Sequence, residues 1–473
     1  MNHSEIARII AAIVVVAPLA PVLPLLLVAG TLGVPSEKRT ATVVRAVVWL
    51  SALASVALAW TWFAGPRDVL GGHSPLDLRY GALVDLGAPE HPIHGRHEGA
   101  YRFELGLLVD GLSVTMSLLT SALTAVIARF SVRYLHREEG FFRYFVLLAL
   151  FAAAMQLLVL AGSLDLLFVG WELVGLSSML LIGFFRLRPG PQRGAITAMV
   201  TYRTTDIGLL IAAVLLHHAA GSSEFADAFG RGAWPQHSTH FSPTESTLVC
   251  LSLLLAAVGK SALFPLGTWL PRAMEGPTSS SALFYGGLSV HAGVYLLLRA
   301  APLLSQSLVA SIAVGTLGVL TAVTATLTSR TRSDVKSALA YATMTQVGWM
   351  LLWIGLHLWT VALAHLVAHA CLRTLQLLRA PSALQDAEAI RAALSSERDA
   401  VGTTTENSRL FRWAYRVALE DFFVDRVMQR ALIRPLVALS ARFDAIELRI
   451  ERWVGAEKPP SVTPSRTSPN EVH

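Results

Sequence analysis

The chain has 473 residues, of which 53% are hydrophobic and only 15% are charged. A soluble domain has about 25% charged residues, so this composition excludes an ordinary soluble protein and indicates a polytopic membrane protein. The formal net charge of +6 does not indicate a nucleic-acid partner, because the basic residues are in short loops between apolar runs. Cys250 and Cys371 each lie within an apolar run, so we expect neither a disulfide nor a metal site from them.

Apolar runs long enough to cross a bilayer occur along most of the chain. A spanning helix needs about 20 mostly apolar residues, and eleven runs are candidates. They are 8–30, 41–64, 105–130, 142–162, 164–185, 195–216, 246–270, 279–300, 308–328, 335–356 and 358–380. The first run has no clear small-residue cleavage site, so we interpret it as a span and not as a removed signal. The sequence therefore predicts an all-α membrane fold of about eleven transmembrane helices.

The remaining segments divide the chain further. Residues 1–104 contain two spans and an outer loop, and residues 105–383 form the main transmembrane domain. Residues 384–408 read as a linker. Residues 409–456 alternate apolar and charged positions at helical spacing, which predicts an amphipathic helical region. The tail 457–473 has the composition of a disordered segment.

Loop charge predicts the orientation in the membrane. Arg and Lys gather after the first, third, fifth and ninth runs, at positions 38, 39, 45, 133, 137, 143, 186, 188, 193, 330, 332 and 336. The short connections after the fourth and tenth runs have none, and the one after the eighth has only Arg299. We therefore expect the N-terminus outside, and the C-terminal amphipathic region in the cytoplasm, where it lies on the membrane or docks a partner.

Charged residues recur in three successive runs between positions 164 and 270. Glu172 is near the middle of its run, in GWELVG, and Arg203 and Asp206 are three residues apart in the next. Lys260 is near the centre of the third, followed by Pro265. A charge at bilayer depth costs roughly 2.5–3.5 kcal/mol on insertion scales, so their default interpretation is an ion or proton path.

Each of these residues has a functional and a structural interpretation. Glu172 is a candidate proton-relay carboxylate, or it lies near the headgroups and is merely solvated. Arg203 and Asp206 share a helix face and can form a local ion pair, which is structural, tunes Glu172, or both. A desolvated lysine such as Lys260 exchanges its proton readily, and a proline one turn later breaks the helix beside it, as at transporter midplane sites.

Later runs add further candidates. Lys336 begins the tenth run, where a lysine near a cytoplasmic end is ordinary. His365, His369 and Arg373 recur at i, i+4 and i+8, so they share one face of the last run. A proton wire suits these histidines better than a metal, since no third ligand is evident; packed, hydrogen-bonded histidines are the alternative. His291 in the eighth run is a further candidate.

Several long motifs resemble the proton-conducting antiporter-like family, which includes the large membrane-arm subunits of complex I and the large subunits of multi-subunit Na⁺/H⁺ antiporters. They lie between Asp110 and Asp386 and include DGLSVTM, GWELVGLSSMLLIGF, GKSALFPLGTWLPRAMEGPTSSSAL, SDVKSALAYATMTQVGWM and AHLVAHACLRTLQLL. The resemblance implies that Glu172 and Lys260 are the family's coupled pair and that Lys336 is a path lysine. His365 and His369 match the family's paired histidines, and Arg373 stands where lysine is usual.

The sequence also departs from that family. Tyr285 replaces the usual histidine after SAL, and the apolar runs stop where the second inverted repeat normally continues. This truncated pattern, with SSALFYGGLSVHAGVYLLLR and LRTLQLLRAPSALQD, looks most like the membrane subunit of DAB-type inorganic-carbon accumulation systems. That likeness implies an inner-membrane subunit in which H⁺ flow drives CO₂ hydration in a large cytoplasmic, zinc-containing, carbonic-anhydrase-like (DabA-type) partner.

Two other interpretations stay open. One is a subunit of a respiratory complex or of a Na⁺/H⁺ antiporter, and the other is a non-conducting anchor for a cytoplasmic partner. The chain shows no phosphate loop, CxxC cluster or dinucleotide glycine pattern. We therefore expect no cofactor, no metal and no catalytic site in this chain, with zinc only in the partner, and membrane lipids around the spans.

Overall fold

A computed structural model describes residues 3–66, 73–85, 102–230, 232–235, 241–380, 409–423, 426, 430–431 and 434–454. The chain divides into two compact units, Met1–Val424 and Asp425–His473. The expected linker 384–408 and the expected tail 457–473 lie outside the described residues.

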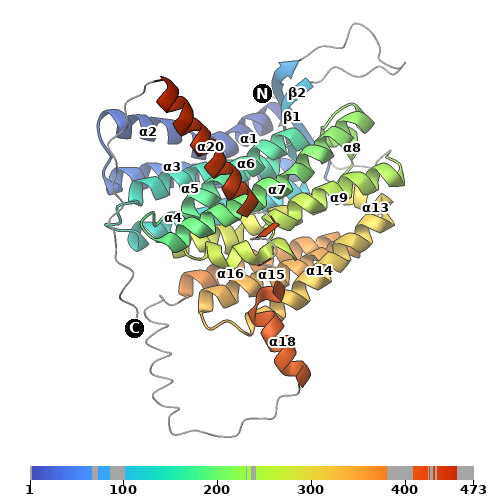
Figure 1. Ribbon diagram of the computed structural model, residues 1–473. Coiled ribbons are helices and arrows are strands. Elements are labelled where there is room, and N and C mark those ends of the chain that lie inside the picture. The colour runs from blue at the N-terminus through green and yellow to red at the C-terminus, as the bar shows by residue number, and fades with distance from the viewer. Residues whose placement is uncertain are drawn as a thin grey trace, which may run out of the picture. The chain divides into compact units, whose positions relative to one another are not determined.

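The first unit is a bundle of helices (Figure 1). Its α-helices are α1 His3–Leu19, α2 Val22–Thr31, α3 Glu37–Phe63, α4 Gly111–Tyr134, α5 Phe141–Leu160, α6 Leu164–Ile182, α7 Pro189–Ala220, α8 Phe225–Ala228, α9 Pro243–Lys260, α10 Trp269–Ala273, α11 Thr278–Ser281, α12 Ala292–Arg299, α13 Ala301–Gln306, α14 Leu308–Ser329, α15 Val335–Gly355, α16 Trp359–Arg379 and α18 Arg409–Leu419. This confirms the predicted helical membrane fold.

Nine helical stretches within the described residues are long and apolar enough to cross a membrane. The expected runs 246–270 and 335–356 also contain helices, α9 and α15, but neither is among the nine. Helix α9 ends at Lys260, ten residues before its apolar run does. The stretch α11–α12 is fully buried inside the bundle, whereas most residues of α1–α2 and of α3 are only partly buried or exposed.

A β-hairpin occupies part of the segment interpreted as a loop and the start of the third apolar run. Strand β1, Leu76–Asp85, pairs antiparallel with β2, Arg102–Val109, with Leu76 opposite Val109. The prediction that a helix begins at 105 is therefore wrong. Helix α4 begins only at Gly111, because Asp110 caps it: its carboxylate accepts from the Ser113 amide at 2.9 Å. Figure 1 shows the hairpin and α8 at the same end of the bundle.

Two helices in the middle of the bundle are broken. After Lys260 the backbone turns at Ala262, whose φ is +54°, and the chain continues as the short η2, Leu266–Thr268, and then α10. The break therefore comes earlier than the one expected at Pro265. In the next segment a π-helical turn, η3 Ala282–Gly287, and η4, Ser289–His291, precede α12. Such turns leave backbone groups free for other partners and are frequent at functional sites.

Close contact between glycines joins α14 to α15. A Cβ added to Gly318 would lie 2.6 Å from the carbonyl oxygen of Gly348, so only glycine allows the two backbones to approach this closely. In a membrane the hydrophobic effect does not drive helices together. Small residues at a helix crossing allow close van der Waals packing, which stabilises the helix pair instead.

The amphipathic region 409–456 is helical in both units. In the first, α18 is followed by η6, Asp421–Phe423, where the carboxylate of Asp421 accepts a 2.6 Å hydrogen bond from the Tyr341 hydroxyl and pairs with Arg332. The second unit contains α20, Arg434–Val454, which mixes charged and apolar residues along its length.

Candidate functional site: a buried charged path

Lys260 is the most deeply buried charged residue of the predicted path. It ends α9 with a fully buried side chain, and its Nζ donates a 3.0 Å hydrogen bond to the backbone carbonyl of Trp171. The ammonium also lies over the rings of Trp171 and Tyr202, 4.8 and 4.5 Å from their centroids. A Cβ at Gly175 would lie 3.0 Å from Nζ, so that glycine leaves the space that the ammonium occupies. Lys260 therefore ends its helix and does not lie in the middle of one, as its place in the apolar run suggested, but its burial agrees with the expectation of a desolvated lysine.

Glu172 and Asp206 have different partners from those predicted. Arg203 forms its ion pair with Glu172 on the neighbouring helix α6, and Asp206 accepts a 2.6 Å hydrogen bond from the indole of Trp171. Within the described residues Arg203 and Asp206 do not pair with each other, because Asp206 faces inward, 4% exposed, while the Arg203 side chain is 45% exposed. Trp171 thus joins the parts of the cluster: its carbonyl holds Lys260 and its indole holds Asp206.

The structure brings His291 and His369 together from separate helices. His291 Nε2 lies 2.9 Å from His369 Nδ1, and both side chains are buried. At one end His291 Nδ1 lies 2.9 Å from the Gly287 carbonyl, and at the other Arg373 Nε donates to His369 Nε2 at 3.5 Å. The sequence placed His369 and Arg373 on one helix face, which the structure agrees with, but it did not predict the contact with His291.

The groups at the two ends of this row of hydrogen bonds, Arg373 and the Gly287 carbonyl, determine which atom donates in each bond. A carbonyl only accepts and a guanidinium only donates. Therefore His291 carries its proton on Nδ1, His369 carries its proton on Nδ1, and both rings are neutral. Each hydrogen bond of this row is therefore donated in the direction from Arg373 toward Gly287.

The other predicted residues lie nearby or apart. His365 contacts the Gln346 side chain at 3.0 Å and accepts from the Trp353 indole at 3.3 Å, and its ring centroid is 6.4 Å from that of His369. Lys336 is half-buried in the first turn of α15, and the structure shows no contact between it and Lys260 in the described part of the chain.

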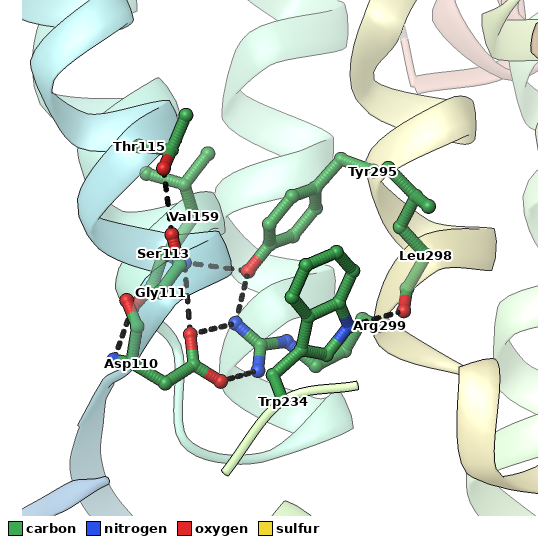
Figure 2. Close-up of polar contacts among 9 residues, drawn as sticks. All are labelled: Asp110, Gly111, Ser113, Thr115, Val159, Trp234, Tyr295, Leu298 and Arg299. Atoms are coloured by element: carbon green, nitrogen blue, oxygen red, sulfur yellow. Dashed lines mark hydrogen bonds and ion pairs between the residues drawn. The ribbon is translucent and has the colours of Figure 1, made fainter. Parts of the chain in front are cut away.

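An ion pair between Asp110 and Arg299 was missed by the sequence analysis, which placed Arg299 in a loop. Arg299 instead ends α12, and its guanidinium binds both carboxylate oxygens of Asp110; the two side chains are 3% and 1% exposed. Figure 2 shows the guanidinium between Asp110 and the Tyr295 hydroxyl, which accepts from it at 3.1 Å and donates to the Val159 carbonyl at 2.7 Å. The capping pattern DGLS was the available signal for Asp110, and nothing in the sequence paired it with Arg299.

Polar residues of the hairpin end form a second cluster. Arg79 on β1 binds Glu104 at 3.1 Å and Glu224 at 2.7 Å. Burial raises the pKa of Glu224 to about 6, and the nearby Arg79 only partly offsets this. Titratable groups thus lie at this end of the bundle as well as inside it.

Metal binding does not suit these groups. Among the described residues, no three His, Cys, Asp or Glu side chains are grouped as a metal site would need. The facing nitrogens of His291 and His369 are occupied by each other. What the arrangement can do is hold and pass protons, because it places a lysine, two carboxylates and a histidine pair inside spans that lipid otherwise surrounds.

Comparisons with known proteins agree with this geometry. The family model described as "NADH:quinone oxidoreductase/Mrp antiporter, TM" matches residues 161–397, half of the chain, and "NADH-Ubiquinone oxidoreductase (complex I), chain 5 N-terminus" matches residues 97–145.

Individual proteins give the same result. The chain is 35% identical over 318 residues to NAD(P)H-quinone oxidoreductase subunit 5 of Nephroselmis olivacea, covering 65% of this chain and 49% of that one. It is 37% identical to NADH-quinone oxidoreductase subunit L of Escherichia coli K12, covering 60% and 46%. In the solved structure of the Mrp complex from Dietzia sp. DQ12-45-1b, one chain matches 79% of this chain over 36% of its own length, with 29% identity and a TM-score of 0.57. The chain spans about half the length of these two curated relatives.

Proposed function

Because the chain belongs to the family of proton antiporter-like membrane subunits that includes those of NADH:quinone oxidoreductases and Mrp antiporters, we propose that it conducts a cation, H⁺, across the membrane. The observation that carries the proposal is the complete burial of Lys260 beside Asp206 and the Glu172–Arg203 pair. A buried ionisable cluster in a membrane helix is costly and marks an ion path by default.

Glu172 and Lys260 form the core relay, and Arg203 and Asp206 tune their charge. The burial of the ammonium supports this assignment, because among the described residues the lysine is held by one backbone carbonyl and two aromatic faces, with no carboxylate in direct contact. It can therefore lose its proton at modest cost.

The path continues through the histidines. His369 and His291 carry protons between helices, and Arg373 fixes the tautomer of His369. His365 and Lys336 belong to this part of the path as well. The chain lies in the cell inner membrane, with the N-terminus outside and the C-terminus in the cytoplasm; the loop charges support this orientation.

More specifically, ion flow through this chain drives inorganic-carbon accumulation by a large cytoplasmic zinc-containing partner. Its support is the sequence likeness around Tyr285, His291 and the LRTLQLLRAPSALQD segment. In this complex the chain supplies ion flow and the partner supplies the chemistry.

A second candidate is a subunit of a quinone oxidoreductase or of a Na⁺/H⁺ antiporter. The relatives favour it, since they are quinone oxidoreductase subunits and a chain of an Mrp complex. The two candidates differ in what the chain assembles with.

Two experiments test the proposal. In native membrane vesicles, an imposed electrical potential should drive acidification or alkalinisation that depends on this chain and is unchanged when sodium is replaced by choline; flux that requires sodium would contradict H⁺ as the ion. Purification in mild detergent should recover one large soluble zinc protein. Recovery of iron–sulfur and flavin subunits, or of several small membrane subunits, would instead favour the second candidate.

A further inference from the structure

We propose that Asp110 and Arg299 form a gate at the hairpin end of the ion path, and that the cavity beside Arg299 is its water-filled opening. The inference rests on the proposed function and assigns to it two residues outside the Lys260 and histidine clusters.

The pair is built as a closed charge contact. Both side chains are almost fully buried, and Arg299 uses Nη1 and Nη2 on the two oxygens of Asp110. The Ser113 amide fixes one carboxylate oxygen at 2.9 Å, and the Tyr295 hydroxyl fixes the guanidinium at 3.1 Å. As Figure 2 shows, these partners come from the start of α4 and from α12. Because removing one charge of a buried pair leaves the other uncompensated, the contact is strongly biased toward its closed state.

A cavity at the hairpin end reaches Arg299. It has a volume of about 150 Å³, and its lining includes Ser74 and Asp77 of the hairpin region, Ala226 of α8 and Arg299. That volume has room for several water molecules. Among the described residues the Nε of Arg299 has no hydrogen-bond acceptor. Arg299 lines the cavity, and a buried guanidinium N–H without a protein acceptor points to water as its partner.

The other side of the gate faces the histidine pair. His291, Tyr295 and Arg299 follow one another at i, i+4 and i+8, so they lie along one face of the segment that contains η4 and α12. Eight residues of helix span about 12 Å. All three side chains are buried, and the Tyr295 hydroxyl lies at the Arg299 end of the row. The histidine pair and the cavity thus lie along one buried face of the same segment.

The gating step is a balanced proton transfer. A proton arriving from the histidine side forms an O–H bond on the Asp110 carboxylate, which becomes neutral. Its ion pair with Arg299 weakens, and the guanidinium turns toward the cavity, where water accepts its hydrogen bonds. Asp110 then releases the proton to that water, the carboxylate regains its charge, and the ion pair forms again.

Cysteine labelling tests the opening. In full-length chain carrying Cys371→Ser, with the buried Cys250 kept, Ala226→Cys should react with a membrane-impermeant methanethiosulfonate from one side only, and labelling should cut proton flux about tenfold or more. Val84→Cys, on the hairpin and 42% exposed, is the matched control and should label without loss of flux. Normal flux after complete labelling of Ala226→Cys would overturn the opening.

Charge removal tests the gate. The double variant Asp110→Asn/Arg299→Gln keeps hydrogen-bonding groups at both positions without a buried unpaired charge. It should insert and melt like the wild type but lose about tenfold or more of its flux, with an altered pH profile. Asp165→Asn, whose carboxylate binds Ser223 at 2.5 Å near the same end, should conduct normally. Normal flux in the well-folded double variant would overturn the gate.

The two levels of the proposal can fail separately. If Lys260→Ala loses flux while the double variant and labelled Ala226→Cys keep it, only the gate is wrong. If Lys260→Ala conducts normally, the proposed function itself fails. Should the double variant not fold, the labelling result alone decides.

Discussion

The Nζ of Lys260 lies 3.0 Å from the backbone carbonyl of Trp171, the residue directly before Glu172. This hydrogen bond ties the broken end of α9 to the middle of α6. Through the Trp171 indole the same residue also holds Asp206 on α7 at 2.6 Å. A movement of Lys260 that shifts Trp171 would therefore also change the positions of Glu172 and Asp206.

Gly175→Ala should displace the ammonium of Lys260. The new methyl group would lie 3.0 Å from Nζ, so the flexible lysine must shift by a few tenths of an ångström and weaken its bond to Trp171. We expect flux to fall by about severalfold, since misplaced proton-transfer groups lose efficiency, with little change in thermal stability. Gly30→Ala, where a Cβ meets nothing within 4 Å, is the control. Equal flux in the two variants would show that the position of the ammonium is unimportant.

His291→Gln and His369→Gln should each stop flux, and the double variant should be no worse than either alone. The two rings are consecutive members of one hydrogen-bonded chain, and glutamine cannot exchange a proton as imidazole does. Flux in native vesicles measures this, with the exposed His136→Gln as control. Additive partial losses would mean that the histidines act on separate routes.

The sequence predicted the residue types of the site but not their pairing. Glu172, Lys260 and the last-helix histidines were recognisable because charged or titratable residues in long apolar runs are rare. The partners of Arg203 and His291 were not predictable, because those contacts join helices whose relative rotation depends on packing between glycines and aromatic side chains. For example, Arg203 pairs with Glu172 on another helix and not with Asp206 on its own helix.

Local backbone structure was also predicted only in part. The sequence indicated a break near Pro265, whereas the helix ends at Lys260 and the turn is made by Ala262. The sequence predicted a helix where strand β2 lies, because Leu105, Leu107, Leu108 and Val109 are as apolar as the residues of a transmembrane helix. In so short a run, the periodicity of apolar residues does not distinguish a strand from a helix.

Lowering the pH should stabilise the hairpin end of the first unit. The pKa of Glu224 is raised from 4.5 to about 6 by burial, so the folded state holds its proton more tightly than the unfolded state. The resulting penalty is fully present above pH 6 and is relieved as the pH falls from about 6 to 4.5.

Glu224→Gln removes that titration. Its melting temperature in detergent should exceed that of the wild type above pH 6, and the two should converge near pH 4.5. A gap that stays constant across this range would contradict the assignment to Glu224.

Asp421→Asn should loosen the segment after α18. The Asp421 carboxylate receives both the Tyr341 hydroxyl and the Arg332 guanidinium, so its neutralisation leaves Arg332 without that counter-ion. We expect faster hydrogen exchange and earlier protease cleavage around residues 409–423, with unchanged exchange in α14. Glu420→Gln is the neighbouring control. Identical exchange in the Asp421 variant and the wild type would show that the ion pair does not hold this segment.

The most direct test of the whole account is proton flux in native membrane vesicles that contain Lys260→Ala, compared with wild type and with the exposed Lys38→Ala. We predict that Lys260→Ala reaches the membrane in normal amount and loses flux by roughly a hundredfold, while Lys38→Ala conducts normally. Wild-type flux in a correctly inserted Lys260→Ala protein would contradict the claim that the buried charges of this chain form an ion path.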